Sequence, residues 1–145
     1  MLSATVFKLR DVLYLHSESK TTDGVWIASG PFLKITNSKS VLGEAALTVL
    51  QASKTSIPHP KPEEWGGIIA PVLQLAGVKS WSKFVKDASS ADLKVEGDRL
   101  KIIPNRNLGH KDGFEPIREK AIELPFPCSS HEIGAAVDEA LARCE

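Results

Sequence analysis

The sequence predicts an α+β fold in a single domain: a mostly antiparallel sheet of about five or six strands, packed by three to four helices in the order ββαααβββα. Three observations support this prediction. A chain of 145 residues is long enough for one hydrophobic core and short for two. The strand-like segments come in groups instead of alternating singly with helices. The helical segments each carry an apolar stripe that can cover a sheet.

The first quarter of the chain has the composition of β-strands. Residues 5–16 are rich in β-branched, aromatic and aliphatic side chains, which predicts a pair of strands that turns near Arg10 and Asp11. A further strand is expected at 24–36. Gly30-Pro31 interrupts this segment and suits a bulge or an edge strand better than the centre of a sheet.

Three helices are expected next. Residues 40–53 place apolar side chains at helical spacing behind a Ser40 cap. Alternate prolines at 57–62 favour an extended connector, and a second helical pattern then runs over 63–76, ended by Gly77 and containing a Pro71 that can kink it.

A short third helix is predicted at 80–86, behind a Ser80 cap. The segment 92–103 then reads as a hairpin, because apolar residues alternate on both sides of a Gly97-Asp98 turn. Residues 105–113 are polar or glycine-rich and predict a loop.

The C-terminal part predicts one more strand at 120–126 and a final helix that begins at Ser129 or Ser130. Cys128 and Cys144 flank this helix. A helix of about fifteen residues holds its ends about 20 Å apart, too far for a disulfide, so two free thiols are expected.

Composition excludes several classes of function. Eighteen basic and eighteen acidic residues give a net charge of zero, so no global field favours nucleic acid or a membrane surface as a partner. No apolar run reaches the roughly 18 residues of a membrane span, and the first ten residues lack the pattern of a signal peptide. We therefore expect a cytoplasmic protein.

No cofactor or metal is expected either. The sequence lacks a P-loop, a dinucleotide fingerprint, a nucleophile elbow and a zinc-binding H-E-x-x-H helix. The cysteines show no C-x-x-C spacing, and the histidines are scattered. These histidines are His16, His59, His110 and His131.

The loop at 105–113 is the strongest candidate for chemistry in the sequence. His110, with His59 or His131 as a second acid–base group and Lys111 or Arg106 on phosphate, would suit a metal-free ribonuclease. The simpler interpretation is a solvated connection whose Asn and Gly residues supply turn geometry.

The three tryptophans also have two possible interpretations, base stacking and core packing. Trp26, Trp65 and Trp81 could stack on bases, but each lies in an apolar periodic segment without a basic stripe. Core packing is therefore the simpler expectation for all three.

Five short segments, taken in their order and spacing, resemble the immunity proteins of bacterial contact-dependent growth inhibition systems, the CdiI type. The segments are Val41-Leu-Gly-Glu-Ala-Ala-Leu47, Ile57-Pro-His-Pro60, Lys79-Ser-Trp-Ser-Lys-Phe84, Ile103-Pro-Asn-Arg-Asn107 and Gly113-Phe-Glu-Pro-Ile117. The resemblance runs from about residue 5 to the C-terminus. It implies that residues 1–145 form one immunity-protein-like domain.

The resemblance implies a cytosolic, non-enzymatic protein that binds the C-terminal toxin domain of a matching CdiA-type surface protein and covers its active site or substrate groove. Many such toxins are nucleases. The resemblance also implies scaffold roles for some matching residues: Gly43 for close packing of the first helix, Asn105 and Arg106 at a strand end, and Phe114 as an aromatic anchor.

Toxin-binding residues are expected among loop and helix-start carboxylates, because a nuclease active site is positively charged and exposed carboxylates complement it. The candidates are Glu63, Glu64, Asp112 and Glu115. Since the net charge is zero, the complementarity has to be local. A small RNA- or phosphate-processing enzyme and a generic interaction module remain as alternatives.

Overall fold

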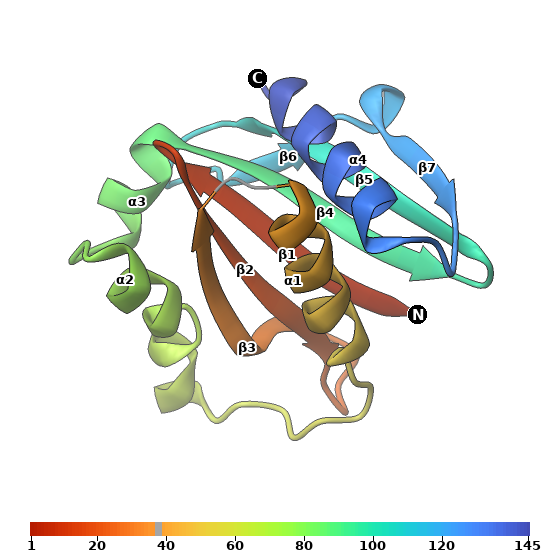
Figure 1. Cartoon of the computed structure of the whole chain (residues 1–145). Coiled ribbons are helices and arrows are strands. Elements are labelled where there is room, and N and C mark those ends of the chain that lie inside the picture. Colours follow the sequence, from red (N-terminus) through yellow and green to blue (C-terminus); the bar gives the residue numbers. More distant parts are fainter. Residues whose placement is uncertain (37–38) are drawn as a thin grey trace.

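The sheet has seven strands in the order β3-β2-β1-β4-β5-β6, and β7 pairs with β5 beside β6 (Figure 1). The computed structural model describes residues 1–36 and 39–145, with side chains described from residue 41 onward in the second range. All pairings between these strands are antiparallel, as predicted. The strands are β1 (Leu2–Leu9), β2 (Val12–Lys20), β3 (Trp26–Thr36), β4 (Ala88–Glu96), β5 (Arg99–Asn107), β6 (Phe114–Pro116) and β7 (Ile122–Pro125).

Four α-helices and two 3₁₀ helices accompany the sheet. They are α1 (Lys39–Gln51), η1 (Pro62–Gly67), α2 (Ala70–Ala76), α3 (Trp81–Asp87), η2 (Arg118–Lys120) and α4 (Ser130–Ala142). Figure 1 shows α1 and α4 side by side across one face of the sheet, with α2 and α3 away from them. No helix in the described part of the chain is long and apolar enough to cross a membrane.

Local signals in the sequence correctly located several boundaries. Ser80 caps α3 by accepting a hydrogen bond from the Lys83 amide, and Ser129 caps α4 in the same way from the Glu132 amide. The Ser40 side chain, expected to cap α1, lies outside the described residues. The Gly97-Asp98 turn joins β4 to β5 as expected.

The interruption at Gly30-Pro31 also has the predicted consequence. Strand β3 lies at an edge of the sheet, and its register against β2 shifts between His16 and Ser17. A proline lacks the amide hydrogen that a ladder needs, so an edge strand accommodates it best.

Two sequence-based expectations were wrong. The helix expected at 63–76 is divided into η1 and α2, because Gly66-Gly67 weakens the helix and Pro71 fits only near the start of a new one. The loop expected at 105–113 begins later, because Asn105–Asn107 extend β5 and pair with β6. Strand β6 is three residues long, too short to show an alternating pattern.

The main core lies between the sheet and the helices α1 and α4. Alternate residues of the central strands point into it, among them Val6, Leu15 and Leu93, which are fully buried. Gly43 lies where α1 crosses the start of α4, and a Cβ there would clash with the Ser130 carbonyl oxygen. The close packing that the resemblance implied for Gly43 is confirmed.

A second, smaller core covers one end of the opposite sheet face. Phe7 and Tyr14 from β1 and β2 pack there against Phe84 of α3 and Val72 of α2. The Trp81 ring stacks on Phe84, with ring centroids 5.6 Å apart. Since α2 and α3 are short, they leave the rest of this face without a helix over it, and polar side chains occupy that part.

Candidate functional site

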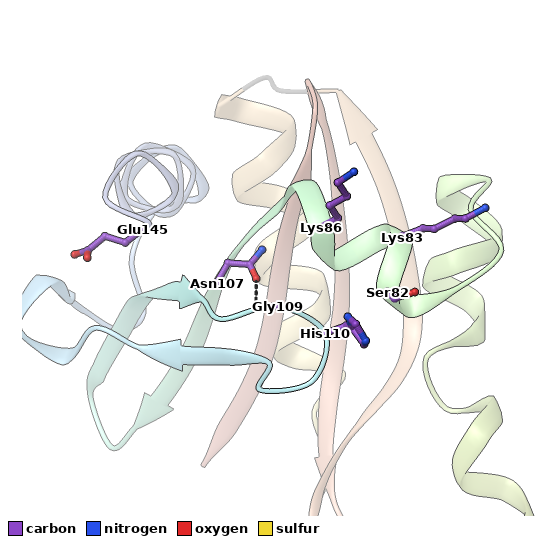
Figure 2. A pocket seen from close by; sticks show the side chains of 7 residues that line it. All are labelled: Ser82, Lys83, Lys86, Asn107, Gly109, His110 and Glu145. Atoms are coloured by element: carbon purple, nitrogen blue, oxygen red, sulfur yellow. Dashed lines mark hydrogen bonds between the residues drawn. The ribbon is translucent and has the colours of Figure 1, made fainter.

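The connection between β5 and β6 forms one wall of a hollow of about 620 Å³ (Figure 2). Asn107 fixes this connection: its Nδ2 donates to the carbonyls of Val85 and Ala88, at 2.6 and 2.9 Å, and its Oδ1 accepts from the Gly109 amide at 2.9 Å. The lining residues are Ser82, Lys83 and Lys86 of α3 together with Asn107, Gly109, His110 and Glu145.

The hollow does not assemble the acid–base pair expected of a ribonuclease. In Figure 2, Lys83 and Lys86 extend outward from α3, and Glu145 lies at the opposite end from His110. No second histidine lines the hollow within the described residues. His59 instead forms a hydrogen bond with the Thr21 hydroxyl, 3.0 Å away, and lines a different hollow. His131 is exposed on the first turn of α4.

The cations proposed to hold phosphate do not converge on His110 either. Arg106 is paired with Glu115 at 2.8 Å and with Glu145 at 3.0 Å. The hydrogen bond and charge of Glu145, followed by those of Glu115, raise the pKa of this guanidinium. Lys111 does not line the hollow. The geometry therefore favours the simpler interpretation of this loop.

The four carboxylates expected to bind toxin are all exposed. Glu64 accepts a hydrogen bond from the Lys61 amide at 2.8 Å, and Glu115 pairs with Arg106. Glu63 and Asp112 have no hydrogen bond or ion pair within the described residues. Among the described residues, no hydrogen bond or ion pair links the two carboxylates of η1 to Asp112 or Glu115.

Trp65, expected in the core, is 40% exposed on η1. The division of the predicted helix explains this difference, because η1 buries no residue of its own. Trp81 does pack in a core, as expected. Both cysteines are free thiols, as predicted.

The sheet face that the helices leave open holds a second pocket, of about 280 Å³, which sequence analysis missed. Its floor consists of polar side chains from four neighbouring strands, and its walls are apolar. The floor residues are Thr5, His16, Glu18, Ser90, Asp92 and Asn105. The walls are formed by Phe7, Ile69, Trp81 and Phe114, with Ala28 at one side.

Hydrogen bonds hold the floor in place. Asn105 Nδ2 donates to Ser90 Oγ at 3.2 Å and to Asp92 Oδ2 at 3.3 Å. Thr5 Oγ1 donates to Asp92 Oδ1 at 3.4 Å. Asn105 is 2% exposed, and its Oδ1 has no hydrogen-bond partner. This oxygen is an unused acceptor in the pocket floor.

The surroundings shift the pKa values of two floor residues. Burial, followed by the charge of Glu18, raises the pKa of Asp92 from its ordinary 3.8 to about 6, against the opposing effects of Asn105, Lys94 and Thr5. Burial lowers the pKa of His16, whose Nδ1–H donates to the Ser17 carbonyl at 2.8 Å. Burial therefore favours the neutral form of the His16 ring.

A period-two signal for this pocket was present in the sequence. Polar residues alternate at positions 3 and 5, 16 and 18, and 90 and 92, and the intervening Ala4 and Ala91 belong to the main core. Within the described residues, no group of three or more His, Cys, Asp or Glu is arranged to hold a metal ion.

Comparison with protein-family models identifies the family of the chain. Residues 31–144 match the family model described as CdiI, CDI immunity protein. The chain belongs to the CDI immunity protein family. This family is one of immunity proteins, which are inhibitors rather than enzymes. No curated protein matches this CdiI-family chain.

Two solved structures share the fold of this CdiI-family member. One is a protein of unknown function from Neisseria meningitidis, with a TM-score of 0.82 and 21% identity over 99% of this chain and 95% of that one. The other is a CdiA-CT/CdiI toxin and immunity complex from Yersinia pseudotuberculosis, with a TM-score of 0.81 and 20% identity over 99% of this chain and 97% of the matched one.

Proposed function

We propose that this chain binds the C-terminal toxin domain of its cognate CdiA-type protein in the cytoplasm and neutralises it by covering the active site or substrate groove. The observation that carries this proposal is the match to the CDI immunity protein family over residues 31–144. The fold shared with a chain of a toxin and immunity complex supports it. Inhibition by coverage requires no catalytic group, only a rigid surface that complements the toxin.

The open sheet face is the surface we propose for the interface. A tight complex buries about 1,600 Å² in total, about 800 Å² on each partner, and this area exceeds any single pocket. The sheet supplies a rigid floor, since its strands are anchored from behind by the main core. A sheet surface of this kind changes little on binding, so the entropy cost of association is low.

Segments that carry the proposed carboxylates, or lie next to them in the sequence, also supply two wall residues of the pocket. Phe114, which lies between Asp112 and Glu115 in the sequence, forms part of the pocket wall, and so does Ile69, which follows the η1 helix of Glu63 and Glu64. Carboxylates placed around an interface accelerate encounter with a basic partner. We propose that Glu63, Glu64, Asp112 and Glu115 have this role.

We further propose that the toxin is a nuclease. The floor of the open face carries Glu18 and Asp92, and neither lysine nor arginine lines its pocket in the described structure. A face with this charge complements a site that binds the phosphates of a nucleic acid.

Calorimetric titration with the toxin domain encoded beside this protein tests the proposal. Nanomolar binding with loss of toxin activity is the expected result, and a toxin domain from an unrelated system serves as the negative control. Assays of that toxin on tRNA and on DNA, with and without this protein, test the nuclease assignment. Absence of binding to the neighbouring toxin would refute the proposed function, whereas binding to a toxin that cleaves neither substrate would refute only the nuclease assignment.

A further inference from the structure

The pocket on the open sheet face contains an acceptor that the protein itself does not use. Asn105 is almost completely buried, and its Oδ1 has no donor among the described residues. The orientation of this amide is determined by Asp92, because a carboxylate oxygen requires the Nδ2 donor opposite it. The oxygen itself is buried, so the role of Asn105 is to hold Asp92 in place in the pocket floor.

The charge in the pocket is also unbalanced. Glu18 and Asp92 line it together, and no lysine or arginine does so in the described structure. Among the described residues, the Glu18 carboxylate accepts only from the Ser3 hydroxyl, at 2.8 Å. Lys94 acts on Asp92 electrostatically but does not line the pocket. A guest with positive charge and several N–H donors would meet both carboxylates.

The walls specify the shape of this guest. Phe7, Trp81 and Phe114 place aromatic rings around the polar floor, and Ile69 adds an aliphatic contact. The volume of about 280 Å³ has room for one long side chain. A guanidinium group is planar, stacks on aromatic faces and carries five N–H donors, whereas an ammonium group is compact and strongly hydrated.

We propose that this pocket receives an arginine side chain of the bound toxin, with its guanidinium between the aromatic walls and its N–H groups on Glu18 and Asp92. This inference rests on the proposed function, and it deepens that function by naming the chemistry recognised at the centre of the interface. A buried arginine anchor is a common source of binding energy at protein interfaces.

A small probe tests the pocket without any toxin. N-acetyl-arginine methylamide is titrated at millimolar concentration while NMR records the side-chain amide of Asn105 and the indole N–H of Trp81. Saturable shifts confined to these groups are expected for the wild-type protein, with weak or no shifts for the isosteric, uncharged citrulline derivative. The shifts should disappear in Glu18→Gln and Asp92→Asn and persist in Glu139→Gln, which removes a carboxylate from the exposed surface of α4.

A double-mutant cycle tests the pocket within the complex. Glu18→Gln and Asp92→Asn should each weaken binding of the neighbouring toxin domain by tenfold or more, mainly through faster dissociation, while Glu139→Gln changes it less than twofold. Toxin arginines are then replaced by glutamine one at a time. One replacement should weaken binding to the wild-type protein and have little further effect on Asp92→Asn.

The outcomes separate this inference from the proposed function. If the wild-type protein does not bind the toxin at all, the proposed function fails, and the arginine probe still reports on the pocket. If the toxin binds but both pocket variants bind it as well as the wild-type protein does, the arginine assignment is overturned. The same holds if the citrulline derivative shifts the two signals as strongly as the arginine derivative. Circular dichroism of each variant confirms that it is folded.

Discussion

Replacing Asp92 with asparagine should stabilise the free protein at neutral pH. The carboxylate is largely buried on the pocket floor, where burial and the nearby charge of Glu18 raise its pKa from 3.8 to about 6. At about 1.4 kcal/mol for each pH unit, this rise corresponds to at most about 3 kcal/mol of lost stability when the carboxylate is fully ionised. Asparagine has nearly the same shape and carries no charge.

The sign of the effect follows from proton binding. Because the folded state holds the Asp92 proton more tightly than the unfolded chain does, this residue stabilises the fold most below a pH of about 4, and the contribution is lost as the pH rises through about 6. The Asp92→Asn variant lacks this dependence. Its advantage over the wild-type protein should therefore grow by about 2 kcal/mol between a pH of about 4.5 and a pH of about 7.5.

Urea denaturation of both proteins at these two pH values measures the difference. Comparing the two proteins cancels the titration of all other groups, and Glu139→Gln controls for the loss of one negative charge at the surface. A free-energy difference that stays the same at both pH values would refute the reasoning. So would a wild-type protein that gains stability relative to the variant as the pH rises.

Three further predictions concern packing, the loop and association. Gly43→Ala should destabilise the protein by about 1–3 kcal/mol or more in urea denaturation, because the new methyl group meets a backbone carbonyl that cannot move aside; an unchanged midpoint would contradict this contact. Asn107→Ala should lower the free energy of unfolding by about 1–3 kcal/mol, because two backbone carbonyls lose their donor. It should also increase the mobility of His110 in NMR relaxation, and unaltered relaxation would show that the Asn107 amide does not hold the loop. Replacing the proposed toxin-binding carboxylates with lysine should slow association with the toxin in stopped-flow measurements, and the effect should be smaller in high salt. Association rate constants equal to that of the wild-type protein would show that these carboxylates do not contribute to the interface. These carboxylates are Glu63, Glu64, Asp112 and Glu115.

Features set by neighbouring residues could be predicted from the sequence. The caps at Ser80 and Ser129 and the turn at Gly97-Asp98 depend on a few adjacent positions, and all three occur in the structure. The alternating apolar residues at 92–103 likewise predicted the hairpin of β4 and β5. The break between η1 and α2 was missed because the apolar spacing continues across Gly66-Gly67.

The sheet pocket could not be predicted because it depends on contacts between distant parts of the chain. Asn105 and Asp92 are thirteen residues apart, and Thr5 and Asp92 are eighty-seven apart. The alternation of polar residues indicates that they share a face, but whether a helix covers that face depends on where α2 and α3 pack. Asn105 itself was assigned to a loop, since its partner strand β6 is too short to leave a pattern.

The central strands serve two surfaces with different tolerance to mutation. On β1, Val6 is fully enclosed beneath α1 and α4, whereas its neighbour Thr5 contributes to the open pocket. Large-to-small substitutions in a closed core cost about 2–5 kcal/mol, whereas loss of a hydrogen bond at a buried floor residue such as Thr5, which is 6% exposed, costs about 1–3 kcal/mol. Such a sheet can present a polar floor to a partner on one face while the other face keeps the protein folded.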